Sequence, residues 1–342
     1  MKISISIGGS ALEGDFDQQV QYVREAEKLG VESVWSVEGW GSDAITPLAY
    51  LAAKTERIRL GTAIMQASAR VPAMTAMTAL TLAAISKDRF ILGLGTSGPQ
   101  IVDGLHGVPF TAPLSRLRET VEIIRMAFNG EKLSYQGKIH TLPHSADGKA
   151  IRLATPPNKS IPIYVAALGP RSLEFVGAEA DGWLGTSFTP EYADALLGSI
   201  KKGAEESGRN ISDLDIHVGA ADVGFGEDPE ALANPLRMGR AFTIGGMGSA
   251  KTNFYMQAYS RGGWKDDVNE VQRLWLEGKR EEAAARVPTE MILQTNLLGN
   301  DKAIAERIQA YENAGVTTLK VTPRGKTVSD RLDTLARLLE LT

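Results

Sequence analysis

The chain has 342 residues, of which 43% are hydrophobic and 23% charged, as in an ordinary globular protein. Its formal net charge of −4 gives no basic surface for nucleic acid or membranes, and its apolar runs are too short to span a bilayer. The lack of cysteine excludes disulfides, thiolate nucleophiles and zinc–cysteine sites, and a strand pattern begins at once in Met1-Lys2-Ile3-Ser4-Ile5, so we expect a cytoplasmic protein.

Short β-rich runs alternate with helical patterns along the first part of the chain. The predicted strands cover residues 3–7, 32–37, 58–65 and 89–94. Each precedes a helical pattern, over residues 16–29, 46–54, 74–85 and 114–128. Gly30 and Gly130 end the first and the last of these helices.

The same rhythm continues after a small hairpin, which is predicted to pair residues 133–135 with 139–141. Further strands are predicted at 161–167, 182–186, 215–221 and 317–322, with helices at 171–179, 190–207 and 328–339. Eight strands, most of them followed by a helix, favour an α/β fold of the closed (β/α)8 TIM barrel type over an open doubly wound sheet. We therefore expect one domain over residues 1–342, with a helical and loop insertion at about 224–300 after strand seven. Such an insertion lies over the active-site face in this fold, so we interpret it as a substrate lid.

In this fold the functional residues follow the carboxyl ends of the strands. The segments at these positions are Gly8-Gly9-Ser10, Glu38-Gly39-Trp40-Gly41-Ser42-Asp43, Gly61-Thr62-Ala63-Ile64-Met65-Gln66, Gly95-Thr96-Ser97-Gly98-Pro99-Gln100, Leu168-Gly169-Pro170-Arg171 and Thr186-Ser187. They are rich in glycine and hydroxyl residues, and they offer only Glu38 and Asp43 as carboxylates. This composition suits the binding of a large cofactor better than acid–base hydrolysis, which needs facing carboxylates or a Ser–His pair.

The turn after strand five is the strongest candidate for an anion site. Free N–H groups at the helix start after Gly169, together with the hydroxyls of Thr186 and Ser187, predict that the backbone approaches a phosphate. An alternative remains for each glycine, namely that it only forms a tight turn. Glu38 has the alternative of a solvent-exposed helix cap, and Trp40 that of an ordinary core residue.

Other motifs carry less weight. The four histidines have no metal-ligand spacing, so we expect no metal site. Gly95 and Gly98 do not form a dinucleotide fingerprint, and Gly245-Gly246-Met247-Gly248-Ser249 is predicted to be a loop. The aromatic residues of the insertion either line a pocket or bury its own helices or a dimer interface; they are Phe254, Tyr255, Tyr259, Trp264 and Trp275.

Three stretches together resemble the luciferase-like monooxygenase superfamily, and more closely its coenzyme F420-dependent oxidoreductase branch. They are EGWGSDAITPLAYLAAKTERIRLGTAIMQ, ARVPAMTAMTALTLAAISKDRFILGLGTSGPQIVDGLHG and YVAALGPRSLEFVGAEADGWLGTSF. The resemblance is strong over residues 1–210, weakens through the insertion and returns near AGVTTLKV. The combination of LGLGTSGPQ with AALGP is the specific part.

The resemblance implies a TIM barrel, a homodimer, and a deazaflavin in the barrel mouth. It implies a non-prolyl cis peptide at Ala63–Ile64 behind the ring, and ring contacts with Glu38, Thr62 and Ser97, flanked by Thr96 and Gly98. The phosphate tail is expected near Ala167, Leu168, Gly169, Pro170, Thr186 and Ser187. Sugar-phosphate dehydrogenases of this branch carry an Asp–His pair where this chain has Glu38-Gly39, and a Glu where it has Gly98-Pro99, which argues against that substrate.

The function implied is hydride transfer between C5 of coenzyme F420 and an activated C=C, C=N or C=O bond, or an alcohol in the reverse direction. Glu38 and Ser97 are the side chains predicted to assist catalysis, with Glu38, Ser97 or water moving the proton. Two alternatives remain open, a monooxygenase that binds FMN and a non-catalytic cofactor-binding protein.

Overall fold

The structure is a computed structural model that describes residues 1–7, 15–248 and 253–342. Eight parallel strands form a closed barrel: β1 (Lys2–Ile7), β2 (Ser33–Ser36), β3 (Arg59–Thr62), β5 (Phe90–Gly95), β8 (Ile163–Ala166), β9 (Gly182–Gly185), β10 (Asp215–Phe225) and β12 (Thr318–Pro323). Neighbours in this order pair with each other, β9 with β10 included, and the pairing of β12 with β1 closes the ring. The predicted (β/α)8 barrel is confirmed.

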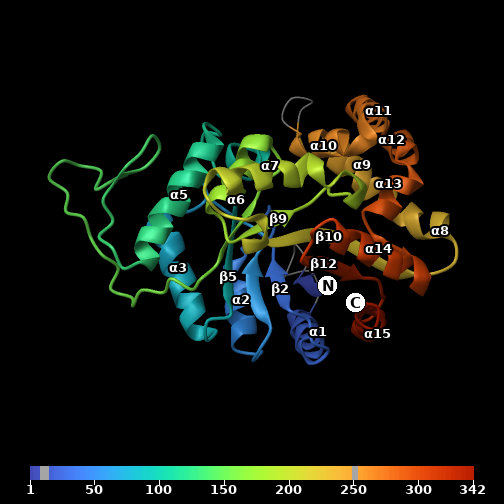
Figure 1. Cartoon of the computed structure of the whole chain (residues 1–342), viewed down its shortest axis with the longest axis horizontal. Coiled ribbons are helices and arrows are strands. Elements are labelled where there is room, and N and C mark those ends of the chain that lie inside the picture. Colours follow the sequence, from blue (N-terminus) through green and yellow to red (C-terminus); the bar gives the residue numbers. More distant parts are fainter. Residues whose placement is uncertain (8–14, 249–252) are drawn as a thin grey trace.

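Helices surround the barrel (Figure 1). They are α1 (Phe16–Lys28), α2 (Ile45–Ala52), α3 (Pro72–Ile85), α5 (Pro113–Phe128), α6 (Pro170–Glu179), α7 (Asp194–Glu206), α14 (Asp301–Asn313) and α15 (Val328–Leu339). Their apolar faces and the outward side chains of the strands, among them Ile5, Leu92 and Leu319, form the main hydrophobic core. Among the described residues, no helix has the length and apolar character needed to cross a membrane.

Short elements supplement the barrel. They are β4 (Met65–Gln66), α4 (Pro99–Val102), the hairpin β6 (Tyr135–Gln136) and β7 (Thr141–Leu142), the 3-10 turns Pro190–Tyr192 and Ile211–Asp213, and β11 (Leu297–Gly299). The hairpin is confirmed, although Tyr135 pairs with Leu142, one residue beyond the predicted segment. The strand predicted over 58–65 is interrupted, because β3 ends at Thr62 and β4 begins at Met65.

The insertion after β10 is helical, and it lies above the end of β10 in Figure 1. Its elements are α8 (Pro229–Ala233), a 3-10 turn (Asn234–Leu236), α9 (Arg237–Gly246), α10 (Phe254–Tyr259), a π turn (Ser260–Trp264), α11 (Lys265–Leu276), α12 (Arg280–Arg286) and α13 (Thr289–Gln294). These helices enclose a second hydrophobic cluster that contains Ile244, Val271 and Met291. β10 runs to Phe225, four residues past its predicted end, and it pairs there with β11.

Gly245 and Gly246 correct one prediction, since they end helix α9 instead of forming a loop. Trp275 of α11 packs against them, and a Cβ atom on Gly245 would lie 2.3 Å from the Cβ of Trp275. The glycines therefore serve close helix packing. Of the remaining predicted loop, Met247 and Gly248 follow α9, while Ser249 lies outside the described residues.

Candidate functional site

Glu38 follows β2 and is held by its neighbours. The Arg70 guanidinium donates a hydrogen bond of 2.7 Å to its carboxylate, which also accepts one from the backbone N–H of Gln66 at 3.2 Å. The Glu38 side chain is only 7% exposed, so it is not a solvent-exposed cap, although its carboxylate also accepts from the N–H of Ala44 at the start of helix α2 at 3.4 Å. The ion pair with Glu38 raises the pKa of Arg70. Glu38 is therefore part of the framework of the mouth.

Thr62 is fully buried between β3 and β5. Its hydroxyl donates to the carbonyl oxygen of Gly93 at 2.8 Å and accepts from the N–H of Gly93 at 2.9 Å. Both hydrogen-bonding functions of the hydroxyl are therefore used within the barrel wall, and the ring contact of Thr62 stays a prediction. The next peptide, Ala63–Ile64, is cis, as the resemblance led us to expect.

The loop after β5 begins with Thr96, Ser97 and Gly98, and all three are partly exposed. Ser97 has a positive φ of 56°, which turns the chain sharply at the strand end. The Thr96 hydroxyl donates to the Ser97 carbonyl oxygen at 3.3 Å. The loop thus presents a serine side chain at the carboxyl end of the barrel, next to the cis peptide in the strand order.

The turn after β8 leads into helix α6 as predicted. Gly169 is the N-cap and Pro170 the first helical residue. The carbonyl oxygen of Ala167 accepts from the indole of Trp183 at 3.0 Å, and that of Leu168 accepts from Arg261 of the insertion at 2.6 Å. The insertion therefore contacts the turn on which we predicted a phosphate.

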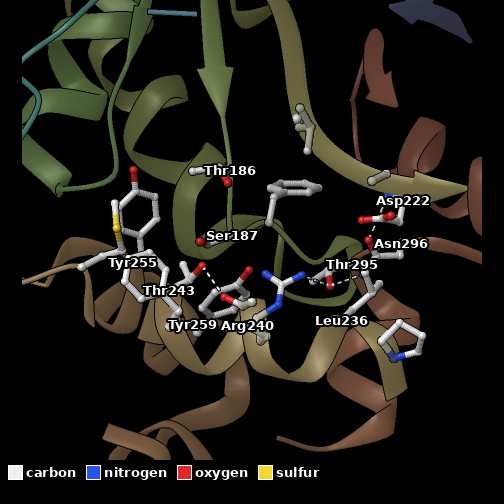
Figure 2. A pocket seen from close by; sticks show the side chains of 18 of the residues that line it. Thr186, Ser187, Asp222, Leu236, Arg240, Thr243, Tyr255, Tyr259, Thr295 and Asn296 are labelled. Carbon is white, nitrogen blue, oxygen red and sulfur yellow. Dashed lines mark hydrogen bonds between the residues drawn. The ribbon is translucent and has the colours of Figure 1, made fainter. Parts of the chain in front are cut away.

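A cavity of about 430 Å³ lies between the end of β9, strand β10 and the insertion (Figure 2). Thr186 and Ser187 form one wall, and Gly219 and Asp222 of β10 contribute another. The insertion supplies most of the remaining lining: Leu236, Gly239, Arg240, Phe242, Thr243, Met247, Tyr255, Tyr259, Thr295 and Asn296. The position of the insertion over this face agrees with the predicted lid position.

Ser187 is notable within this cavity because its hydroxyl is buried and has no hydrogen-bond partner. Its φ of 55° lies in the left-handed region, and the residue is only 8% exposed. A buried hydroxyl normally finds a partner in the protein, in water or in a ligand. Trp40 stands at the rim of the cavity with 65% of its surface exposed, so the alternative of an ordinary core residue is wrong.

Arg240 of α9 was missed in the sequence, and its guanidinium points into the cavity in Figure 2. It donates to the Thr295 hydroxyl at 2.9 Å and lies 5.0 Å from the centre of the Tyr259 ring. Burial lowers its pKa to about 10, so it stays protonated. Within the described part of the chain no carboxylate comes within 4.0 Å of it; Asp222, also in the lining, is 3.8 Å from Arg324.

The aromatic residues of the insertion divide between the two roles considered for them. Tyr255 and Tyr259 line the cavity, Tyr259 is at the same time a buried member of the insertion's own cluster, and Trp264 and Trp275 pack against that cluster. Phe254 remains 37% exposed. Among the residues the structure describes, no group of three or more His, Asp or Glu side chains could hold a metal ion.

The mouth fits a flat, phosphate-bearing cofactor. Positions that alternate inward at the top of the barrel carry small side chains, among them Ala63, Ala166 and Gly219. Around them lie the start of α6 and the unpartnered Ser187 hydroxyl. Gly8, Gly9 and Ser10, the predicted end of strand one, lie outside the described residues.

Comparison with known proteins agrees with this site. The family model "Luciferase-like monooxygenase" matches residues 2–318. The chain therefore belongs to the luciferase-like monooxygenase family. It is 35% identical over 330 residues, 94% of this chain and 95% of the relative, to a Mycobacterium tuberculosis protein whose name places it among the coenzyme F420-dependent oxidoreductases.

A second relative is the F420-dependent glucose-6-phosphate dehydrogenase of Kineococcus radiotolerans, 30% identical over 86% of this chain and 83% of its own length. Among solved structures, the coenzyme F420-dependent tetrahydromethanopterin reductase from Methanopyrus kandleri superposes with a TM-score of 0.79 at 23% identity, over 98% of this chain and 97% of that one. The resemblance to the F420-dependent branch is confirmed by these relatives.

Proposed function

We propose that this chain is a coenzyme F420-dependent oxidoreductase that transfers a hydride between C5 of the deazaflavin and a small organic substrate. The substrate is an activated C=C, C=N or C=O compound, or an alcohol in the reverse direction. The observation that carries the proposal is a mouth of small side chains beside a cavity that holds a buried, unpartnered Ser187 hydroxyl. The names of the relatives support the choice of cofactor.

The residues that would hold the cofactor come from four strand ends. The Ala63–Ile64 peptide and Ser97 would border the ring, while the Leu168–Pro170 turn, Thr186 and Ser187 would bind its phosphate tail. When bound, the reduced deazaflavin supplies a hydride. The protein's part is to orient the substrate and to exclude water, since few titratable groups reach the mouth. Glu38, bonded to Arg70, would fix the shape of the β2–β3 side.

The remaining cavity would hold the substrate. Its walls combine the aromatic faces of Tyr255 and Tyr259 with the cation of Arg240. Because Arg240 has only a neutral hydrogen-bond partner, Thr295, it would bind a substrate that carries a carboxylate or another oxygen-rich group. Asp222 has Arg324 beside it, which reduces its repulsion of such a group. We further propose a homodimer, as the resemblance implies, to be tested by light scattering.

A pair of binding titrations tests the function. Coenzyme F420 and FMN are added separately to the purified protein, and tryptophan fluorescence is recorded. Trp40 lies at the cavity rim, so its fluorescence reports binding there. The matched control is Trp40→Phe, in which any remaining quenching comes from the other four tryptophans. We expect micromolar or tighter binding of F420 and much weaker binding of FMN.

Each other outcome of these titrations has a definite meaning. Tighter FMN binding would move the protein to the oxygen-activating monooxygenases. Binding of neither compound would support a non-catalytic role for the fold. Binding of F420 together with oxidation of its reduced form by a ketone or enone would establish hydride transfer itself.

A further inference from the structure

Lys320 lies inside the barrel, although the proposed function so far gives it no task. It belongs to β12, where Leu319 and Val321 face the helices and pack into the main core. Because side chains alternate along a strand, Lys320 points into the barrel. Its Cα partners are Ser4 of β1 and Gly219 of β10, so it stands between two strands that offer no bulky side chain at its level.

The lack of a side chain at Gly219 leaves room for the end of the Lys320 side chain. A Cβ atom at Gly219 would lie 2.8 Å from Cε and 3.2 Å from Nζ of Lys320. The ammonium group therefore occupies the space that a larger residue on β10 would fill. Gly219 lines the cavity with Thr186 and Ser187, and Lys320 is not itself in this lining but lies directly beside Gly219. Lys320 is accordingly buried only in part.

The ammonium group has no ionic partner among the residues the structure describes. The titratable side chains of β10 on this side are Asp215, His217 and Asp222, and Asp222 lies 3.8 Å from Arg324; β1 contributes the hydroxyls of Ser4 and Ser6, and β2 the indole of Trp35. Asp215 is engaged by Tyr164, Thr317 and Thr318. His217 shares a 2.8 Å hydrogen bond with Ser4. Lys320 therefore has no ion-pair partner in the part of the chain that the structure describes.

Burial lowers the pKa values of both Lys320 and His217. It lowers the pKa of Lys320 to about 8. Burial, reinforced by the charge of Lys320, lowers the pKa of His217 to about 3, so His217 stays neutral and cannot compete as a proton donor. An unpaired ammonium group in a barrel interior costs stability, which indicates a functional reason for its presence.

We propose that Lys320 is the proton donor of the reaction, an inference that rests on the proposed hydride transfer. For a carbonyl substrate, the carbon atom receives the hydride from the reduced deazaflavin, and the π electrons of the C=O bond move to the oxygen. The Nζ–H bond breaks, and the proton forms the O–H bond of the alcohol. Lys320 is left as a neutral amine that regains a proton from water, and in the reverse direction this amine is the base.

The first test measures the acidity of Lys320 without any substrate. Lysine labelled with 13C at Cε reports each ammonium group by NMR, and Lys320→Arg identifies the resonance. We expect a midpoint near 8 for Lys320, whereas the contact with Glu174 raises the pKa of the exposed Lys202 above the ordinary lysine value. A Lys320 midpoint of 10 or above would overturn the proposal, since the group would then be no better an acid than a surface lysine.

The second test measures oxidation of reduced F420 by the ketone levulinate between pH 6 and 10. We expect the wild-type rate to fall as the pH rises through about 8. Lys320→Met and Lys320→Arg should both lower kcat roughly 100- to 10,000-fold and remove this pH dependence. Lys202→Met, on the exposed face of α7, is the control and should keep the wild-type rate.

The outcomes separate the inference from the proposed function. Unchanged rates in Lys320→Met would overturn the role of Lys320 and leave hydride transfer standing, and retention of the rate in Lys320→Arg would replace proton donation by a purely electrostatic role. A wild-type rate equal to the uncatalysed rate would count against the proposed function itself. F420 binding should stay within twofold of wild type in both variants, and their melting temperatures should be equal or higher.

Discussion

The two sides of the barrel mouth differ in whether their polar side chains have partners within the protein. On the side of β2, β3 and β5, Glu38 is paired with Arg70 and Thr62 makes two hydrogen bonds with Gly93, although the amide oxygen of Gln66 and the hydroxyl of Ser68 are buried there without a partner. On the side of β9, β10 and β12, the Ser187 hydroxyl has no partner and Lys320 has no counter-ion among the described residues.

This contrast distinguishes polar groups that stabilise the fold from polar groups that are available to a ligand. Buried polar groups that satisfy one another fix a shape, and those that are left unsatisfied cost free energy unless a ligand completes them. We therefore interpret the β2–β5 side as a rigid support for a cofactor ring. The β9–β12 side, with the insertion above it, is where ligand groups would make the missing contacts.

The largest effect should come from the framework side. In Gly93→Ala, the new Cβ atom would lie 1.8 Å from the carbonyl oxygen of Thr62, a backbone atom that cannot move freely. We expect the free energy of unfolding to fall by about 3 kcal/mol or more. Gly198→Ala in helix α7, where nothing lies within 4 Å of the new atom, should raise it by roughly 0.5–1 kcal/mol. Chemical denaturation measures both, and equal effects would contradict the close packing at Gly93.

Acid should weaken the fold through His217. Its pKa falls from 6.5 to about 3 in the folded protein, so below pH 6.5 the unfolded chain binds a proton that the folded chain does not. Stability must then fall as the pH falls from 6.5 towards 3, by roughly 2–3 kcal/mol between pH 7 and pH 4.5 for this group. His217→Gln should show a shallower dependence in urea unfolding at several pH values. An unchanged slope would mean that His217 is protonated in the fold.

Two hydroxyl deletions compare the sides directly. Thr62→Val keeps the shape of the side chain but leaves the N–H and C=O of Gly93 without their partner, so we expect a loss of about 2 kcal/mol in unfolding free energy. Ser187→Ala removes no hydrogen bond within the protein and should change stability by less than about 0.5 kcal/mol. For F420 affinity, which titration measures, we expect the larger loss in Ser187→Ala and the smaller loss in Thr62→Val. A larger stability loss in Ser187→Ala would remove the distinction.

The smallest effect concerns substrate choice. Levulinate and 2-pentanone are ketones of equal chain length, and only levulinate carries a carboxylate. We expect kcat/KM to favour levulinate about tenfold, or about 1.4 kcal/mol, through Arg240, and Arg240→Met to abolish the preference. Arg209→Met, outside the cavity lining, is the control. A preference that survives in Arg240→Met would assign recognition to another group.

The sequence predicted the barrel, its eight strands and the cis peptide because strand and helix periodicity and the family motifs are local signals. It also placed Ser187 and the α6 turn at the mouth. It did not reveal Arg240 or Lys320 as site residues. Arg240 becomes a site residue only when α9 folds over β9, and Lys320 only when β12 closes against β10 at Gly219.

Predictions for Thr62 and Glu38 were incomplete for a related reason. The sequence shows that both follow strands, but it does not show that Gly93 and Arg70 satisfy their polar atoms. Partners distant in the chain decide whether a polar side chain is available to a ligand. A useful signal for Lys320 was present, namely a lysine at an inward position of a strand opposite a glycine.

The most direct test of the account is a crystal structure of the protein with coenzyme F420 and levulinate. The account predicts the deazaflavin ring against the Ala63–Ile64 peptide, a tail oxygen within hydrogen-bond distance of the Ser187 hydroxyl, and Nζ of Lys320 within hydrogen-bond distance of the levulinate ketone oxygen. A ring bound away from this mouth, or a Ser187 hydroxyl and a Lys320 ammonium group still without partners, would contradict it.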